Sequence, residues 1–302
     1  MKKSALGIAI AGMMAAGSVN AATIYEKGDV SWTLKADVQV QLRQKSGQDE
    51  DSFVDYDDAE LKNRFTYKLG GSTTAFAQVD YDFEKEKSEE TYVGMDFGGY
   101  GFLLGKTDLP SDGFGHEKAW EGSSFEDAFN EVAEDSDNQI QLHAEFAGLE
   151  LKVATDVEDA EVDENGESIQ SKVLFDAFLY GEFGNFDFGV AYQDVEMDPN
   201  ADSIDTFGVG VGAKFGPVSV GVDYSDNDIV EVLHLSTSVK VAPKTKLAIG
   251  YELAEEKGVD IDSWYVNTTY KIHKKVSLLA EVSNTDEDDS DVGYLVGMRV
   301  KF

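Results

Sequence analysis

The sequence predicts an all-β protein, a transmembrane antiparallel β-barrel of 16 strands with a long third loop folded into the lumen. Three observations predict it. Segments of about ten residues alternate between apolar and polar side chains along most of the chain. Short turns and longer acidic loops alternate between these segments, as in the barrels of bacterial outer membranes. A leader for export precedes the first segment.

The first 21 residues have the pattern of a secretory signal peptide. Lys2 and Lys3 precede an apolar run from Ala5 to Ala16, and small residues around Ala21 form a cleavage site. The apolar run is too short to span a membrane. We therefore expect residues 1–21 to be removed on export. Residues 22–302 should then form one barrel domain, because no linker rich in Ser, Pro or Gly divides them.

The composition limits the partners of the exported chain. The full sequence carries 59 Asp and Glu against 25 Lys and Arg, a net charge of −34, and it has no cysteine. Nucleic acid is excluded as a partner, because phosphate binding needs clustered Lys and Arg. The lack of cysteine fits an exported protein that uses no disulfide framework.

The first predicted strand begins at Trp32. Even positions from Trp32 to Leu42 are apolar, while odd positions from Thr33 to Arg43 are polar or charged. Successive side chains of a strand point to opposite faces, so this strand has one apolar and one polar face. The pattern repeats at 61–69 and, after the turn Gly70-Gly71-Ser72, at 75–83. Shorter strands are expected at 91–97 and 100–106.

The stretch from Lys106 to Asp137 breaks this alternation. It opens with a turn at Pro110, and the spacing of Ser123 and Glu126 predicts a short helix with a capping box. One face of that helix would hold Phe125, Ala128, Phe129 and Val132. The stretch contains one internal lysine, Lys118, and ten acids: Asp108, Asp112, Glu117, Glu121, Glu126, Asp127, Glu131, Glu134, Asp135 and Asp137.

An apolar anchor with an acidic front predicts that this stretch folds into the barrel and narrows the lumen. The alternative is a solvated surface loop whose acids only keep the protein soluble. Long loops inside compact domains are usually functional or disordered.

Alternation resumes at Gln139. Strands are expected near 139–146, 149–157, 169–182, 185–195, 203–215, 217–226, 229–242, 244–255, 260–272, 275–285 and 290–302, which completes sixteen. Short turns are expected at 147–148, 184–185, 216–217, 242–243 and 273–274, and longer acidic loops near 46–58, 158–168, 195–203, 255–260 and 285–291.

A soluble β-sandwich is the alternative for this alternation, since it also has one apolar face. Its apolar face would be hidden in a core. Here aromatic residues gather at the ends of the strands on the apolar face, for example Tyr67, Phe83, Phe146 and Tyr270. Aromatic girdles at both membrane interfaces need this placement, so the membrane barrel is favoured.

Four motifs, in order along the chain, carry a resemblance. They are the start Ala22-Thr23-Ile24-Tyr25-Glu26-Lys27, the hairpin of residues 72–83, the Leu109-Pro110 opening of the long loop, and the terminal Phe302. Over essentially all of the mature chain the sequence resembles the general porins of Gram-negative outer membranes. The resemblance implies a trimeric channel of sixteen strands for passive diffusion of small hydrophilic solutes, and it makes Phe302 an assembly signal.

The resemblance also implies a constriction with loop acids on one side and a ladder of wall bases on the other. The acids would be Asp108, Asp112, Glu117, Glu121, Glu126, Asp127 and Glu131. Lys35 and Arg64 match two positions of the ladder, and Lys62 and Arg43 share their inward face by the alternation. Expected arginines are replaced by Gln139 and Gln141 on the sixth strand and fall near Glu89 on the fourth. This thinned basic side predicts a preference for cations.

Other functions remain as alternatives. A substrate-specific sugar channel would need a ladder of lumen aromatics. The aromatics expected to face inward, Phe76, Phe178, Tyr180 and Tyr265, lie on separate strands and are not expected to form a continuous ladder. A phosphate-selective pore would need rings of Lys or Arg. A hydrolase would need a catalytic triad, which sequence alone does not exclude, but the four histidines have no metal-ligand spacing. A purely adhesive barrel would have a plugged lumen.

The expected partners are outer-membrane lipid and lipopolysaccharide, two further copies of the chain in a homotrimer, and the barrel insertion machinery. No cofactor and no defined metal site are expected. Weak binding of Ca²⁺ or Mg²⁺ is expected at the acidic runs 49–51, 55–58 and 286–291, because hard cations take carboxylate oxygens. We expect these runs to lie in the longer, outer loops.

Overall fold

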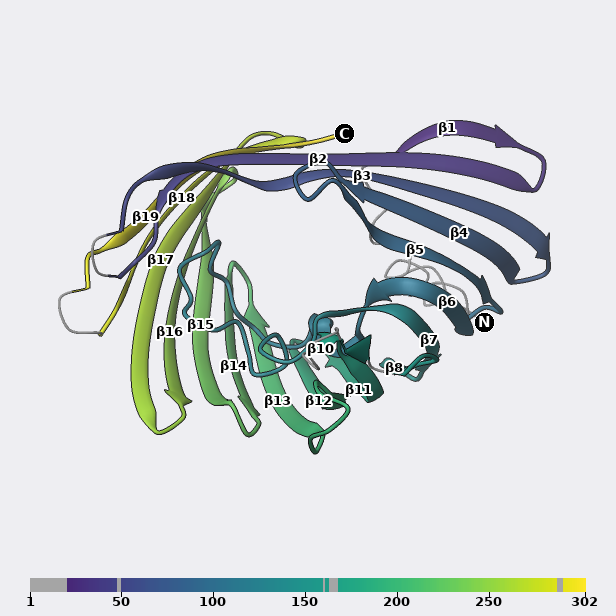
Figure 1. Cartoon of the computed structure of the whole chain (residues 1–302). Helices are drawn as coiled ribbons and strands as arrows, with labels where there is room; N and C mark the ends of the chain where they lie inside the picture. Colours follow the sequence, from purple (N-terminus) through teal and green to yellow (C-terminus); the bar gives the residue numbers. More distant parts are fainter. Residues whose placement is uncertain (1–20, 48–49, 160, 163–167, 287–289) are drawn as a thin grey trace.

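The computed structural model describes residues 21–302, except 48–49, 160, 163–167 and 287–289. The predicted signal peptide therefore lies outside the described residues. Among those residues, no helix has the length and apolarity that crossing a membrane would require. Figure 1 shows the chain as a ring of tilted strands, coloured from the N-terminus to the C-terminus.

The strands form one closed antiparallel barrel, as the sequence predicts. Neighbours in sequence pair throughout, β11 follows β8 directly, and β19 pairs with β2 to close the ring. The barrel strands are β2 (Val30–Gln44), β3 (Phe53–Gly70), β4 (Thr73–Asp82), β5 (Lys87–Asp96), β6 (Tyr100–Asp108), β7 (Asp135–Phe146), β8 (Leu149–Asp156), β11 (Lys172–Phe183), β12 (Phe186–Glu196), β13 (Ile204–Phe215), β14 (Val218–Asp226), β15 (Val230–Ala242), β16 (Thr245–Glu256), β17 (Val259–His273), β18 (Val276–Thr285) and β19 (Gly293–Lys301). Sixteen strands thus surround the lumen.

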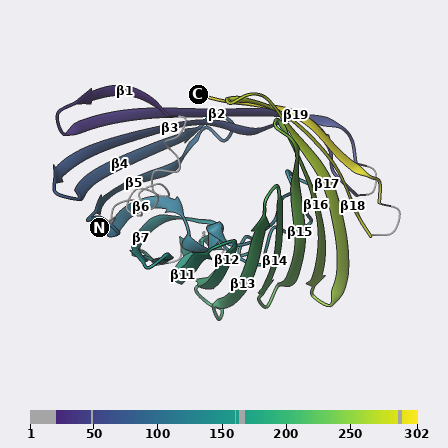
Figure 2. The ribbon, with the colours of Figure 1, turned by 180° about the vertical axis from the view of Figure 1, so that it is seen from behind.

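Three short strands lie outside this ring of sixteen. β1 (Ala22–Lys27) forms a hairpin with the first half of β2, while β19 pairs with the second half. β1 therefore continues the line of β19 along the edge of β2, which Figure 2 shows from behind. β9 (Glu161–Val162) and β10 (Ser168–Gln170) pair with each other inside the connection from β8 to β11.

The two ends of the barrel differ in their connections. We call the end with the tight turns, such as 184–185 and 216–217, the turn end, and the opposite end the loop end. Two predicted loops are shorter than expected. The loop predicted at 255–260 is a two-residue turn, because β16 and β17 continue pairing out to Glu256 and Val259. The loop predicted at 46–58 ends at residue 52, because β3 begins at Phe53 and its Asp55 and Asp58 pair with Gln41 and Gln39 of β2.

The two faces of the wall follow the predicted alternation. Outward side chains such as Phe146, which is 78% exposed, form an apolar outer surface. Inward positions hold buried polar residues, among them Gln39, Gln139 and Gln193. In a bilayer this arrangement turns apolar side chains to lipid and polar ones to the lumen, while the closed ring pairs the strand backbones.

Residues 109–134, here called the lumen loop, lie inside the ring. Figure 1 shows the loop running along the inner side of the green strands. It begins with a 3-10 helix, η1 (Pro110–Gly113), and its two ends are joined by a hydrogen bond of 2.8 Å from the Leu109 N–H to the Glu134 carbonyl.

The predicted apolar anchor of the loop exists, but the predicted helix does not. Ala128, Phe129 and Val132 are buried against wall residues such as Val173, Phe178 and Val232. Residues 128–132 form only turns. The helix expected at Ser123 fails because the Ser123 hydroxyl, which would cap it, instead donates to Glu252 of the wall.

Candidate functional site

The lumen loop is fastened to the wall at a series of points, beginning with η1. Ser111 is fully buried; its N–H donates to Asp176 Oδ1 over 2.9 Å and its hydroxyl to Asp176 Oδ2 over 2.5 Å. Gln193 donates to the same carboxylate and to the Ala133 carbonyl. Asp176 and Gln193 therefore hold both the start and the end of the loop against β11 and β12.

The next attachment lies at His116 and Lys118. The His116 N–H donates to Asp223 Oδ2 over 2.8 Å, and the Ser236 hydroxyl donates to the His116 carbonyl over 2.6 Å. The Lys118 N–H donates to the Tyr265 hydroxyl oxygen over 2.7 Å. These contacts spread the loop across β14, β15 and β17.

Glu281 of β18 holds the loop where it crosses furthest along the wall. Its carboxylate is 4% exposed and accepts the backbone N–H groups of Trp120 and Glu121 over 2.7 and 2.8 Å. Asn267 donates to the same carboxylate and to the Lys118 carbonyl. One buried carboxylate thus fixes two successive peptide groups.

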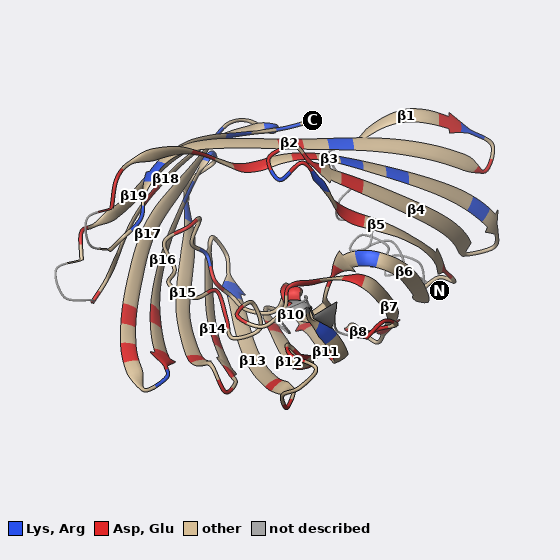
Figure 3. Ribbon diagram, viewed as in Figure 1, with Lys and Arg blue, Asp and Glu red and all other residues tan. Residues whose placement is uncertain are grey.

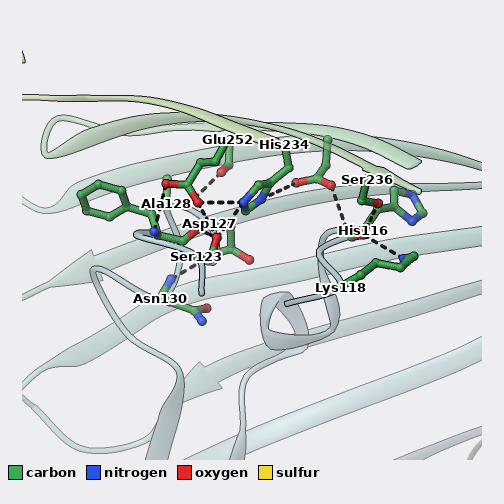
Figure 4. A network of polar contacts seen from close by, with 12 residues as sticks. His116, Lys118, Ser123, Asp127, Ala128, Asn130, His234, Ser236 and Glu252 are labelled. Atoms are coloured by element: carbon green, nitrogen blue, oxygen red, sulfur yellow. Dashed lines mark hydrogen bonds and ion pairs between the residues drawn. The ribbon is translucent and has the colours of Figure 1, made fainter. Parts of the chain in front are cut away.

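His234 forms the most deeply buried charged contact, shown in Figure 4. Its Nε2 lies 2.9 Å from Glu252 Oε2, and its Nδ1 lies 3.5 Å from Asp223 Oδ1. Ser123 Oγ donates to Glu252 and lies 3.0 Å from His234 Nε2. The Phe125 N–H donates to the other Glu252 oxygen over 3.2 Å. His234 therefore links two carboxylates that both hold the loop.

Ser123, His234 and Asp223 lie in the order of a nucleophile, base and acid, but their contacts do not fit that chemistry. Both nitrogens of His234 face carboxylate oxygens, so the ring satisfies both contacts only as an imidazolium. An imidazolium cannot accept the serine proton. The Ser123 hydroxyl also donates to Glu252. The group therefore acts as a clasp between loop and wall.

Asp127 organises the turn that follows. Its Oδ1 accepts the N–H groups of Phe129 and Asn130 over 2.8 and 3.1 Å, which caps the turn from within the loop. The Ala128 N–H donates to Ser225, and Asn227 donates to the Ala128 carbonyl. Asp127, predicted as a constriction acid, is therefore a buried structural residue.

The remaining predicted loop acids divide into two groups. Asp108, at the end of β6, is exposed, as are Asp112, Glu126 and Glu131 of the lumen loop, while Glu117 and Glu121 are half-buried. Glu121 pairs with Arg43 of β2 and accepts a hydrogen bond of 2.8 Å from Gln41. The loop therefore reaches from β11 round to β2.

Burial raises the pKa of five loop carboxyls, those of Asp112, Glu117, Asp127, Glu131 and Glu134. For Asp112, burial and then the charges of Glu134 and Asp127 raise the pKa to about 6. Burial also raises the pKa of Glu117 to about 8 and that of Asp127 to about 7. At pH 7 Glu117 is therefore mostly protonated, whereas Asp112 is mostly ionised.

The predicted wall bases do lie on the inward face, but most of them form ion pairs with acids or stack on an aromatic ring. Arg43 pairs with Asp55 over 2.8 Å as well as with Glu121. Lys62 lies 2.8 Å from Asp80 and 3.0 Å from Glu60. Arg64 donates to Gln78 and Tyr92 and stacks on the Phe76 ring at 4.4 Å. Lys35 is half-buried and faces the same lumen.

Sequence reasoning missed the acids on the opposite wall. Four buried carboxylates, each at most 4% exposed, accept N–H groups of the loop: Asp176, Asp223, Glu252 and Glu281. The signal available in the sequence was their position: each is an acid at an inward place in the middle of a strand. Their partners are backbone groups, which no sequence pattern reveals.

The inward aromatics do not form a continuous ladder. Phe178 is 8% exposed and packs under the loop against Phe114 and Phe129. Tyr265 is 1% exposed and lies beneath Lys118. The loop therefore covers both rings and removes them from the path of a solute.

The acidic runs and the terminal residue complete the predicted set. Among the described residues, no group of three or more His, Cys, Asp or Glu could hold a metal ion. The run 55–58 lies in β3, while parts of the other two runs fall outside the described residues. Phe302 is 56% exposed on the outer face, and its N–H donates to the Ala36 carbonyl over 2.8 Å.

Comparison with known proteins gives consistent similarities. The sequence model of the family described as Gram-negative porin matches residues 5–290. The chain is 27% identical over 336 residues to porin-like protein H of Photobacterium profundum, covering 100% of both chains. It is 23% identical over 270 residues to a monosaccharide porin of Halomonas sp, covering 77% of this chain and 73% of that one.

Solved structures support the fold. The outer-membrane protein OmpT of Vibrio cholerae superposes with a TM-score of 0.77 at 16% identity, covering 92% of this chain and 100% of that one. An anion-selective porin of Comamonas acidovorans gives a TM-score of 0.70 at 15% identity, covering 90% of this chain and 100% of that one. A further OmpT structure is described as a trimer form. At these identities the likeness shows the barrel architecture alone.

Proposed function

The chain belongs to the Gram-negative porin family and is an outer-membrane channel protein, and we propose that its channel passes small hydrophilic solutes by passive diffusion with a preference for cations. The observation that carries the preference is an imbalance of free charge at the lumen loop. Asp112, Glu126 and Glu131 are exposed on the loop, while Arg43 and Lys62 on the facing wall are paired with carboxylates.

Unpaired carboxylates in a narrow lumen attract cations more strongly than the same groups do in open water. Walls of low dielectric focus the field of fixed charges and raise the local concentration of counter-ions. The paired bases contribute little opposing field, because each lies within 3 Å of a carboxylate oxygen. Two wall bases, Lys35 and Arg64, form no ion pair among the described residues, and the three exposed loop acids outnumber them. We therefore expect a negative net field at the loop. Current recordings of purified protein in planar bilayers should show stable open channels with a larger permeability for K⁺ than for Cl⁻.

A substrate-specific sugar channel is the second candidate, because one relative is named a monosaccharide porin. The covered rings of Phe178 and Tyr265 support the non-specific channel instead. Added glucose distinguishes the two. A sugar-specific channel would show saturable block of ion current by glucose, whereas a diffusion channel would show only the small decrease caused by bulk viscosity.

We propose that the protein is a homotrimer, since one structurally similar protein is described as a trimer form. A groove of about 500 Å³ on the outer wall supports this, because it is lined by apolar residues that include Phe65, Tyr67 and Val93. A neighbouring subunit could bury these side chains. Cross-linking in native membranes should yield a species of three chains, and a monomer at all cross-linker concentrations would contradict the proposal.

A further inference from the structure

The turn end of the barrel carries a group of lysines that differs from Arg43 and Lys62 at the constriction, which are paired with carboxylates. Lys240 of β15 and Lys246 of β16 are direct cross-strand partners, so their side chains share one face of the sheet. Ser238 and Ala248, the preceding inward positions on the two strands, are buried. The period-2 alternation therefore places both lysines toward the lumen, three residues from the turn at Pro243.

Lys271 of β17 extends this pair. Lys246 is paired with Thr269, and Lys271 is the next inward position along β17. Diagonal neighbours of this kind lie about 7–8 Å apart, within reach of lysine side chains. Figure 3 shows these basic segments gathered at the end of β15–β18 near the C-terminus, whereas β16 and β17 are acidic at the loop end.

The lumen loop adds a fourth lysine. The Lys118 carbonyl accepts a hydrogen bond of 2.6 Å from Asn267, whose cross-strand partner is Ala248. Lys118 is therefore held one inward position above Lys246. Burial, and then the charge of Lys246, lower the pKa of Lys118, as expected of two neighbouring ammonium groups. We call Lys118, Lys240, Lys246 and Lys271 the lysine cluster.

The lysine cluster lacks the partners that neutralise bases elsewhere. Arg43, Lys62 and Arg299 each pair with carboxylates. Across the described part of the chain, no ion pair is formed by any lysine of the cluster, although the chain has 59 acidic residues. Lys118 Nζ donates only to the His116 carbonyl.

The acids nearest to the cluster are already occupied. Asp223 accepts the His116 N–H and faces His234, while Asp187 lies 3.4 Å from the His116 ring. Glu117 adjoins Lys118, but burial raises its pKa to about 8, so it is mostly uncharged at pH 7. Like charges placed directly opposite each other on a sheet are destabilising. An anion bridging the ammonium groups would remove that repulsion.

From this geometry we propose that the lysine cluster is a docking site for small multivalent anions of the phosphate or polycarboxylate class at the turn-end mouth of the lumen. Several ammonium groups within reach of one another suit an anion with more than one charged group, and a lysine ammonium binds phosphate as a point charge. The hydroxyls of Thr269 and Ser277, cross-strand partners of Lys246 and Lys271, are neutral donors beside it. The proposal rests on an open lumen, as in the proposed function.

A site at one mouth makes block of the channel depend on the side of addition. Sodium triphosphate added at the turn end should reduce K⁺ current at a concentration about tenfold lower than at the loop end, because loop-end acids repel it. An Asn185→Cys variant reports which mouth faces each chamber, since the chain has no other cysteine and residue 185 lies in an exposed turn. Labelling with an impermeant thiol reagent from one side gives the orientation.

Matched variants test the residues. The Lys246→Gln/Lys271→Gln double variant should raise the turn-end blocking concentration by about tenfold or more, the effect of losing two charged contacts. Lys45→Gln/Lys87→Gln makes the same charge change at exposed loop-end positions and should leave that concentration within about twofold. The single variant Lys240→Gln removes one positive charge instead of two. It tests the same site if the double variant folds poorly.

The outcomes separate this inference from the channel itself. Equal block from both sides, or block that Lys240→Gln and the double variant leave unchanged, overturns the docking site while K⁺ preference without triphosphate stays intact. Absence of ion conductance in wild-type protein would instead contradict the proposed function. Sided block that the double variant abolishes and the control retains supports the site.

Discussion

At the scale of the residue, buried acids on the wall act mainly on backbone groups. Asp176, Asp223, Glu252 and Glu281 each accept N–H groups of a loop that has almost no regular structure. Hydrogen bonds to charged acceptors contribute about 1.5–3 kcal/mol each, more than bonds between neutral groups. A loop with no internal ladder is thereby held in one position inside the barrel.

The His234 clasp predicts strong coupling between its members. His234→Gln should destabilise the folded barrel by about 3–5 kcal/mol, because it leaves Asp223 and Glu252 buried without a counter-charge. Glu252→Gln added to His234→Gln should recover part of that loss. The unfolding midpoint of the heat-modifiable form on gels measures each variant. Strictly additive losses would show that the two residues do not act together.

Glu117 predicts a pH-dependent stability. Burial raises its pKa from 4.5 to about 8, so the folded state binds the proton more tightly than the unfolded state. The contribution of this carboxyl to stability therefore rises as pH falls from about 8 to about 4.5 and is unfavourable above pH 8. Glu117→Gln should raise the unfolding midpoint at pH 8.5 by about 2 °C and have little effect at pH 4.5.

Glu255→Gln serves as the control for Glu117→Gln, because Glu255 is exposed at the loop end of β16. It should change the midpoint little at either pH. An equal gain from Glu117→Gln at pH 8.5 and 4.5 would mean that removal of the charge is not its cause.

At the scale of the element, the strands and the inward folding of the lumen loop could be predicted, but the internal structure of the loop could not. A strand needs only a period of two, and segments such as 32–42 carry it over their whole length. Errors occurred where local signals compete with tertiary contacts. Ser123 has the spacing of a helix cap, yet its hydroxyl is used by Glu252, 129 positions away in the chain. The loop expected at 255–260 became strand because acidic residues at an exposed rim can pair as readily as apolar ones.

The same limit explains the candidate site. The alternation was sufficient to predict that four bases face inward, namely Lys35, Arg43, Lys62 and Arg64. It could not show that Arg43 is paired with Glu121, because the two meet only when the loop crosses the lumen. Nor could it separate Asp112, which is exposed, from Asp127, which caps a buried turn.

The last strand predicts an effect on assembly. Phe302 follows β19 and has an exposed ring, and we propose that this ring is recognised during insertion of the barrel. Deleting Phe302 should lower the amount of folded barrel in the outer membrane severalfold, because the ring proposed to be recognised is lost. The barrel itself loses only one backbone contact, to Ala36, and no core packing. Single-channel conductance of the barrels that do insert should be unchanged. Wild-type amounts of folded protein in the deletion strain would contradict the assignment.

At the scale of the whole molecule, charge is distributed along the axis of the barrel. The loop end and the lumen loop are acidic, whereas Lys240, Lys246 and Lys271 lie toward the turn end of β15, β16 and β17. Figure 3 shows basic positions at that end of these strands. A cation entering from the loop end meets the acids of the lumen loop first. The central claim is that these acids, left unbalanced by the paired wall bases, set the selectivity.

The reversal potential under a KCl gradient tests that claim most directly. Wild-type channels at pH 7 should show the sign of K⁺ preference, and the preference should weaken below pH 6 as Asp112 takes up a proton. The triple variant Asp112→Asn/Glu126→Gln/Glu131→Gln should lower the potential by roughly half. The control Asp51→Asn/Asp202→Asn/Asp228→Asn, three exposed acids at the loop end, should lower it less. A wild-type preference for chloride, or equal losses in the two triple variants, would contradict the account.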